Sequence, residues 1–173
     1  MQRLDMRRAR AFTLVEILIV VVLLGVLAAI VVPTVGNSAT RARETTLAMD
    51  LNLLRRFIPI YTSQHLETPP GYPNGNRNTP PTEDAFVEQA TLSSTAAGLT
   101  AARGSAGFPY GPYLSKIPVN PFNRLDTVEI LADGQAFPAT ADDSDGWVCK
   151  PATGEIRPDN TGSDSSGELY YDY

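Results

Sequence analysis

One acidic side chain at the edge of a long apolar run is the feature of this 173-residue chain that most strongly indicates chemistry. Glu16 follows a leader with four arginines and comes directly before residues 17–32, all of which are apolar or glycine. A carboxylate in hydrocarbon costs several kcal/mol unless it is neutralised or paired, so Glu16 predicts a positively charged partner. The simpler interpretation is that Glu16 extends to the lipid headgroups from near the helix end.

The apolar run that follows Glu16 has the length of a membrane span. Residues 17–32 with their apolar neighbours would rise about 30 Å as a helix, which is the thickness of a bilayer's hydrocarbon core. The run has no polar face, unlike a helix packed on a soluble core. The arginines before it, Arg3, Arg7, Arg8 and Arg10, predict that the N-terminus stays cytoplasmic and the rest lies outside.

Two other interpretations of the apolar run remain open. A helix buried on all sides in a soluble protein can be equally apolar, although the rest of this chain is short and polar. A secretory signal would also combine basic and apolar residues, with cleavage here near Gly36 to Ala39. Such signals have an apolar core of about 7 to 15 residues and no need for a glutamate at its border.

The residues around Glu16 resemble a known processing motif. Ala11 is followed by Phe12-Thr13-Leu14-Val15-Glu16, with Gly25 and Pro33 further along. This pattern resembles the leader and N-terminal helix of type IV pilins and type II secretion pseudopilins. The resemblance implies that a prepilin peptidase cuts between Ala11 and Phe12 and methylates Phe12. The family usually has glycine before the cut, so Ala11 is a departure that bears on the efficiency of processing.

The resemblance also implies roles in assembly for Glu16, Gly25 and Pro33. The new amine of one subunit would meet Glu16 of its neighbour, giving a homo-oligomeric helical filament. Glycine and proline cost about 1 and about 3 kcal/mol relative to alanine in a helix, so both weaken the segment, which could loosen on assembly. Lipid-facing helices also tolerate both residues without any such role.

The chain is expected to have an α+β, pilin-like fold. The expected parts are a leader (1–11), a transmembrane assembly helix (12–35), an amphipathic half of the same helix (36–60) and an extracytoplasmic head (61–173). In the amphipathic half, apolar or small residues recur every three or four positions, and Pro59 is expected to limit the helix. The stripe predicted to face the head contains Val35, Ala39, Ala42, Thr46, Met49, Leu53, Phe57 and Ile60.

The head is predicted to contain a short helix followed by a small sheet. Capping and apolar spacing indicate a helix from Thr82 through Ser94. Strand composition and turn signals predict three or four antiparallel strands. Their predicted ranges are 127–131, 135–137, 147–150 and 155–157.

Five aspartates near the C-terminus form a candidate metal site. Pseudopilins are known as a family to hold calcium near the end of the sheet, and calcium prefers oxygen ligands. The candidate ligands are Asp142, Asp143, Asp145, Asp159 and Asp164. Their spacing does not fit the helix-loop-helix calcium motif, and solvated acidic loops are the alternative.

Composition argues against several other functions. Cleavage after Ala11 would remove four arginines and one aspartate, changing the formal net charge from −5 to −8 and giving no support for nucleic-acid binding. Cys149 is the only cysteine, so no disulfide can form within the chain. His65 and Cys149 could formally form a nucleophilic dyad, but no third group or motif supports one, and no enzymatic function is expected.

The function expected from these observations is that of a structural subunit of a type II secretion pseudopilus, which drives protein export. Its expected partners are further copies of itself, the prepilin peptidase, other pseudopilins and the inner-membrane secretion platform. Its expected location is the bacterial inner membrane, with a periplasmic head. The alternatives are a type IV pilin of a surface pilus and a single-pass, membrane-anchored binding module.

Overall fold

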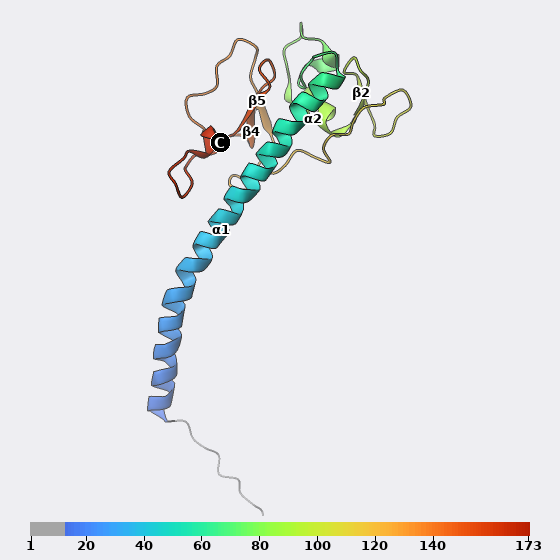
Figure 1. Ribbon diagram of the computed structural model, residues 1–173. Coiled ribbons are helices and arrows are strands. Elements are labelled where there is room, and N and C mark those ends of the chain that lie inside the picture. The colour runs from blue at the N-terminus through green and yellow to red at the C-terminus, as the bar shows by residue number, and fades with distance from the viewer. Residues whose placement is uncertain (1–12) are drawn as a thin grey trace, which may run out of the picture. The chain divides into compact units, whose positions relative to one another are not determined.

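The computed structural model describes the backbone of residues 13–173, and the side chains of 13–29 and 38–173. The chain divides into two compact units, residues 1–41 and 42–173. Helix α1 (Leu14–Gln64) begins in the first unit and ends in the second. Figure 1 labels the helices and most of the strands.

The second unit combines the end of α1 with short elements of both kinds. Its other α-helix is α2 (Glu83–Thr91), and two 3-10 turns cover Pro73–Gly75 and Tyr170–Asp172. The strands are β1 (Ser93–Ser94), β2 (Thr100–Ala101), β3 (Val128–Ile130), β4 (Trp147–Lys150) and β5 (Glu155–Pro158). The mixture confirms the predicted α+β class.

Two small sheets organise these strands. β1 and β2 form an antiparallel pair, whereas the second sheet has the order β3-β4-β5. β4 and β5 are antiparallel, with Trp147 opposite Pro158, so the predicted second hairpin is confirmed. Gly154, with a φ of +71°, lies in the left-handed conformation that the turn between them requires.

The antiparallel prediction was wrong for β3, which pairs with β4 in parallel. Residues 131–146 leave the sheet where β3 ends and return to the opposite end, where β3 begins. A connection of a dozen or more residues allows such parallel pairing. The predicted strand at 135–137 is also absent. The turn at Asp133-Gly134 forms, since Gln135 N donates to Ala132 O over 2.9 Å. Phe137, however, packs against a buried cluster instead of pairing in the sheet.

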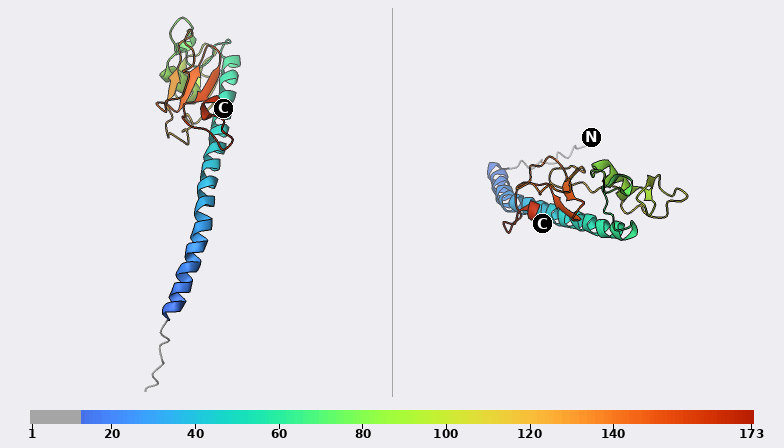
Figure 2. Two further views of the ribbon diagram at one scale, coloured as in Figure 1. Left: turned by 90° about the vertical axis from the view of Figure 1, so that its left-hand side faces the viewer. Right: turned by 90° about the horizontal axis from the view of Figure 1, so that it is seen from above.

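The three-stranded sheet β3-β4-β5 has buried side chains on both faces. On one face, Trp147 and Cys149 of β4 join a core made with α1 and α2. Figure 2 shows the strands of this sheet beside the end of α1. On the other face, Val148 packs with Leu131, Ala141 and Tyr171. Successive side chains of a strand point to opposite faces, so the central strand β4 is buried along most of its length.

The buried face of α1 differs from the stripe that the sequence predicted. In the second unit it is formed by Leu47, Leu51, Leu54, Phe57, Ile58, Tyr61 and His65. Of the predicted stripe, Phe57 is in the core, while Met49, Leu53 and Ile60 are exposed. This part of α1 therefore carries two apolar stripes, and the larger side chains occupy the buried one.

Both helices that contribute to the head end at residues other than the predicted ones. α1 does not end at Pro59 but continues to Gln64. A proline removes one helix hydrogen bond, and the burial of Tyr61 and His65 beyond it favours continuation. The helix predicted from Thr82 is confirmed, with the Thr82 side chain accepting from Ala85 N as N-cap, but it ends at Thr91.

Candidate functional site

The start of α1 places Glu16 in the first helical turn. Thr13 precedes the helix, and its hydroxyl oxygen accepts a hydrogen bond from Glu16 N at 3.2 Å. An acidic residue three positions after a capping threonine is typical of helix starts, where a negative charge interacts favourably with the helix dipole. Glu16 therefore has a local role in its own chain, and its side chain is exposed. The predicted cleavage residues Ala11 and Phe12 lie outside the described residues.

The apolar side chains after Glu16 are exposed within this single chain. All large apolar residues from Ile17 to Leu27 have about half or more of their surface accessible. Exposed apolar surface of this extent marks a contact with lipid or protein. Within the described residues, no helix combines the length and hydropathy needed to span a membrane.

Both predicted helix-weakening residues lie inside α1. A Cβ added at Gly25 would meet no atom within 4 Å, so no contact within the chain requires glycine there. Pro33 is also helical, although its side chain is outside the described residues. The predicted loosening on assembly stays a prediction for both.

Three of the five predicted acidic ligands come together in one network. Asp159 follows β5, and its Oδ1 accepts from Asp142 N at 3.1 Å. Its Oδ2 accepts from Asp145 N at 3.0 Å. Asp142 Oδ1 in turn accepts from Ser144 N at 3.0 Å, and interactions with the side chain and N–H of Ser144 hold the pKa of Asp142 below its usual range. The loop before β4 is thus tied to the end of β5.

The other two predicted ligands lie in separate networks. Asp143 accepts hydrogen bonds from Asn160 Nδ2 and from the Thr161 N–H and hydroxyl. Asp164 closes a turn of its own by accepting from Ser166 and Glu168. The bond from Ser166 is the largest cause that lowers the pKa of Asp164, to about 2.

A further acidic side chain, which was not among the predicted ligands, lies next to this network. Glu129 is on β3, where strand alternation places it on the opposite face from Val128. Burial raises the pKa of Glu129, and the negative charges of Asp145, Asp159 and Asp142 raise it further. Within the described part of the chain, no three acidic, histidine or cysteine side chains are placed to hold a metal ion.

Two asparagines, also missed from the sequence, hold the acidic loops in place. Asn123 Nδ2 donates to Asp145 O at 2.6 Å and to Asp159 O at 3.0 Å. Asn120 is fully buried and donates to Gly146 O at 2.8 Å. A Cβ at Gly146 would approach Leu125 O to 2.4 Å, so only glycine fits where the backbone passes this close to Leu125. The sequence signal that could have predicted these bridges is the pair of asparagines within residues 120–123, because asparagine side chains can link backbone groups of different segments.

Comparisons with known proteins identify the family. Residues 6–32 match the model of the prokaryotic N-terminal methylation motif. The type II secretion system core protein G of Klebsiella pneumoniae is 31% identical over 130 residues, which cover 75% of this chain and 79% of that protein. The chain belongs to the type II secretion system core protein G family.

Further relatives come from the core protein G family and from type IV pili. The core protein G of Aeromonas hydrophila is 27% identical, over 83% of this chain and 96% of that protein. A type IV wide pilus major component, PilA4 of Thermus thermophilus, is 38% identical over 32% of this chain and 43% of that protein. No solved structure matches the chain. The resemblance to pseudopilins, drawn from the residues around Glu16, is thereby confirmed.

Proposed function

We propose that the chain is a non-enzymatic structural subunit that is cut between Ala11 and Phe12, methylated on Phe12 and assembled into a secretion pseudopilus. The observation that carries this proposal is the position of Glu16, exposed in the first turn of α1 and followed by an exposed apolar surface. The match to the methylation motif over residues 6–32 supports the processing step.

Assembly follows from the opposite charges of two groups that would meet between neighbouring subunits. Cleavage creates an ammonium group at Phe12, and the Glu16 carboxylate of a neighbouring copy is its natural partner. In a bundle of apolar helices, such a pair fixes the register between subunits more than it adds net stability. Before assembly the same apolar helix would hold the protein in the inner membrane, with the head in the periplasm. The prepilin peptidase, other pseudopilins and the inner-membrane platform are the proposed partners.

A measurement of the mature N-terminus and of assembly tests this function. The N-terminal peptide should begin with Phe12 and carry one added methyl group. Glu16→Gln, which keeps the shape but removes the charge, should abolish sedimentable fibres, because the amine of the neighbour loses its partner. Glu67→Gln is the matched control, since Glu67 is exposed in the head.

Each other result supports one of the alternatives. A terminus near Ala39 would indicate an ordinary secreted domain. An intact Met1, with membrane binding unchanged by Glu16→Gln, would indicate an anchored binding module. Long surface fibres in electron micrographs would indicate a type IV pilus rather than a pseudopilus.

We also propose that calcium binds the loop at 142–145 together with Asp159. The support is the chemistry of the donors alone, since Asp142, Asp145 and Asp159 carry carboxylates within one hydrogen-bonded network and calcium prefers such oxygens. These three are not placed to hold a metal ion in the described structure, so calcium would have to turn them towards a common point. Nearby Glu129 adds a fourth negative charge, whereas Asp143 and Asp164 belong to other networks. Calcium would neutralise this charge and stabilise the loop.

Calcium removal tests this second proposal. Ligand binding to the folded state stabilises it, so chelation should lower Tm, and calcium at about 100 times its Kd should restore about 2.7 kcal/mol. Asp145→Asn should remove the calcium-dependent part of Tm, whereas Asp126→Asn, on the exposed loop before β3, should retain it. A Tm independent of calcium would contradict the proposal.

A further inference from the structure

The second apolar stripe of α1, opposite its buried face, has no partner within the described head. Met49, Leu53 and Ile60 are 67%, 46% and 48% exposed. Together with Arg56 they occupy positions i, i+4, i+7 and i+11, which align on one side of a helix. We use "outer stripe" for these four residues. Arg56 carries the only charge of the outer stripe. Among the described residues the one ion pair joins Arg157 to Glu155, so Arg56 forms no ion pair within the described part of its own chain.

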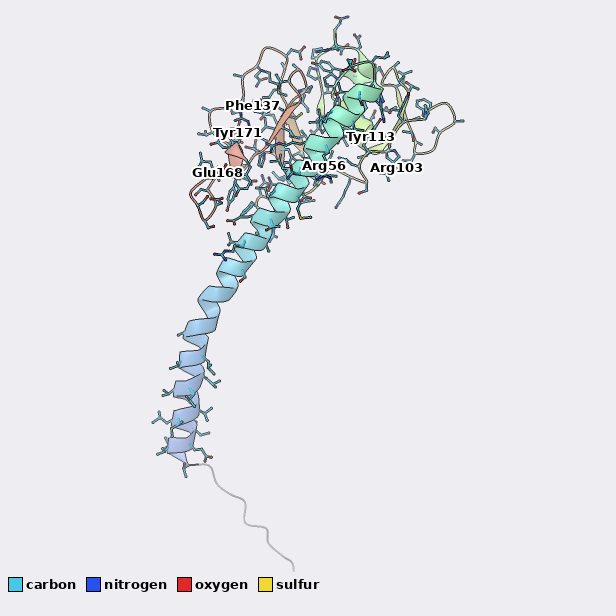
Figure 3. The ribbon with its side chains drawn as sticks, viewed as in Figure 1. Arg56, Arg103, Tyr113, Phe137, Glu168 and Tyr171 are labelled. Atoms are coloured by element: carbon cyan, nitrogen blue, oxygen red, sulfur yellow. The ribbon has the colours of Figure 1, made fainter. Side chains whose placement is uncertain are left out.

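A turn near the C-terminus has complementary properties. Glu168 and Leu169 are both exposed, Leu169 by 51%. They therefore present one negative charge next to one large apolar side chain. Figure 3 shows Arg56 on α1 and Glu168 on a separate loop, apart from each other. The two patches thus do not satisfy one another within a chain.

The turn that carries this pair is held in a defined conformation. Asp164 Oδ1 accepts from Ser166 N at 2.7 Å and from Glu168 N at 3.0 Å. Tyr173 OH donates to Asp164 Oδ2 at 3.0 Å, and Ser163 and Leu169 form a β-bridge. A preorganised loop loses less conformational entropy on binding than a free one.

We infer that the outer stripe binds the Glu168–Leu169 turn of a second copy of this chain, with Arg56 opposite Glu168 and the leucine against Leu53. The two patches are different and lie on separate elements, so the contact is heterologous. A heterologous contact that does not close a ring generates an open helical filament. The inference rests on the proposed function and deepens it by naming the surfaces through which the heads meet.

Cysteine cross-linking in the full-length, membrane-assembled protein tests this pairing directly. A disulfide needs the two Cα atoms within about 7 Å, so it reports contact between neighbours. Leu53→Cys and Leu169→Cys in the same chain should give a ladder of oligomers under mild oxidation. Chains with one cysteine each should give only dimers when mixed. The native Cys149 is buried and should not react.

The controls separate this arrangement from its rivals. Leu66 is also an exposed leucine next to an acid, since it is 76% exposed and followed by Glu67, so Leu66→Cys combined with Leu53→Cys should give no ladder. Dimers from Leu53→Cys alone would mean that two outer stripes face each other and would overturn the inference. Fibres that form without any Leu53–Leu169 linkage would overturn it as well, while leaving the proposed function intact. Absence of fibres from the unmodified chain would instead contradict the proposed function.

Charge exchange gives an independent readout of the same contact. Arg56→Glu and Glu168→Arg should each reduce sedimentable fibres by about tenfold or more, because like charges then meet at the interface. The double variant should recover most of the loss. Lys116→Glu and Asp126→Arg, which change exposed charges elsewhere on the head, should leave assembly unchanged. Failure of the double variant to recover, with all variants folded, would count against the pairing.

Discussion

At the scale of single residues, His65 is a titratable side chain in an environment very different from water. It is 1% exposed and stacks on Tyr61 with ring centroids 3.7 Å apart. Its Nδ1 lies 2.7 Å from Tyr61 O, which can only accept, so Nδ1 donates and Nε2 accepts from the Ser94 hydroxyl at 2.8 Å. Both ring nitrogens are used by the neutral form, and burial lowers the pKa of His65.

This environment predicts that the head loses stability below about pH 6.5. The unfolded chain binds a proton on His65 near its ordinary pKa of about 6.5, whereas the folded chain binds it at lower pH. The free energy of unfolding should therefore fall as pH decreases from 6.5 towards the folded pKa. His65→Gln should cost about 1–3 kcal/mol at pH 7 and flatten this dependence.

Urea denaturation at a series of pH values checks this prediction. His65 is the only histidine of the chain, so the difference in slope between the two proteins isolates its titration. The raised pKa values of Glu129 and Asp50 increase the free energy of unfolding as pH falls, which is opposite to the effect of His65. Both carboxyl groups are present in the unmodified chain and in the His65→Gln variant, so their effect cancels in the comparison. Equal slopes between pH 5 and 7 would show that His65 titrates alike in the folded and unfolded states.

Residue types alone identified part of the acidic network and could not identify the rest. Asp142, Asp145 and Asp159 were predicted to share a site and do share hydrogen bonds. Asp143 is adjacent in sequence but faces Thr161, because its φ of +60° turns the chain at that residue. Composition carries no information about such a turn. The period of two in β3, by contrast, could have placed Glu129 with the others.

At the scale of elements, local patterns were more predictive than pairings between distant segments. The β4–β5 hairpin and the N-cap of α2 depend on a few neighbouring residues, and both were predicted correctly. The parallel pairing of β3 with β4 depends on where residues 131–146 return, which no local signal encodes. The fold class was therefore predictable, whereas the strand order was not.

Helix α1 illustrates the limit of periodicity as a signal. Two stripes with three- or four-residue spacing run along its head portion, and either satisfies an amphipathic pattern. The structure buries the one that contains Leu54, Ile58 and Tyr61. Phe57, which was placed in the predicted stripe, is buried with them and contacts Tyr61 with ring centroids 5.9 Å apart. Aromatic side chains bury the most apolar surface, so side-chain volume was the better criterion. The remaining stripe is then available for assembly.

At the scale of the whole molecule, the hydrophobic core of the head and the exposed apolar segment after Glu16 lie in different parts of the chain. Both hydrophobic clusters consist of residues between Leu47 and Tyr173, so the unit formed by residues 42–173 contains a core of its own. The described apolar side chains from Leu14 to Leu27 are exposed. Stability of the head should therefore be independent of the segment that drives assembly.

A fragment of residues 42–173 is accordingly expected to fold cooperatively and to stay monomeric without detergent. Its core holds Phe57 against Phe86 and Tyr113, each with ring centroids 5.5 Å apart. Phe57→Ala in the fragment should cost about 3–5 kcal/mol and lower Tm by roughly 10 °C or more, because it leaves a cavity among these rings. Leu53→Ala, on the exposed stripe, should change Tm by only a few degrees, since its surface is not part of the core. Calorimetry and size-exclusion chromatography check both expectations, and a broad, non-cooperative transition of the unmodified fragment would show that residues before Ala42 are needed for the fold.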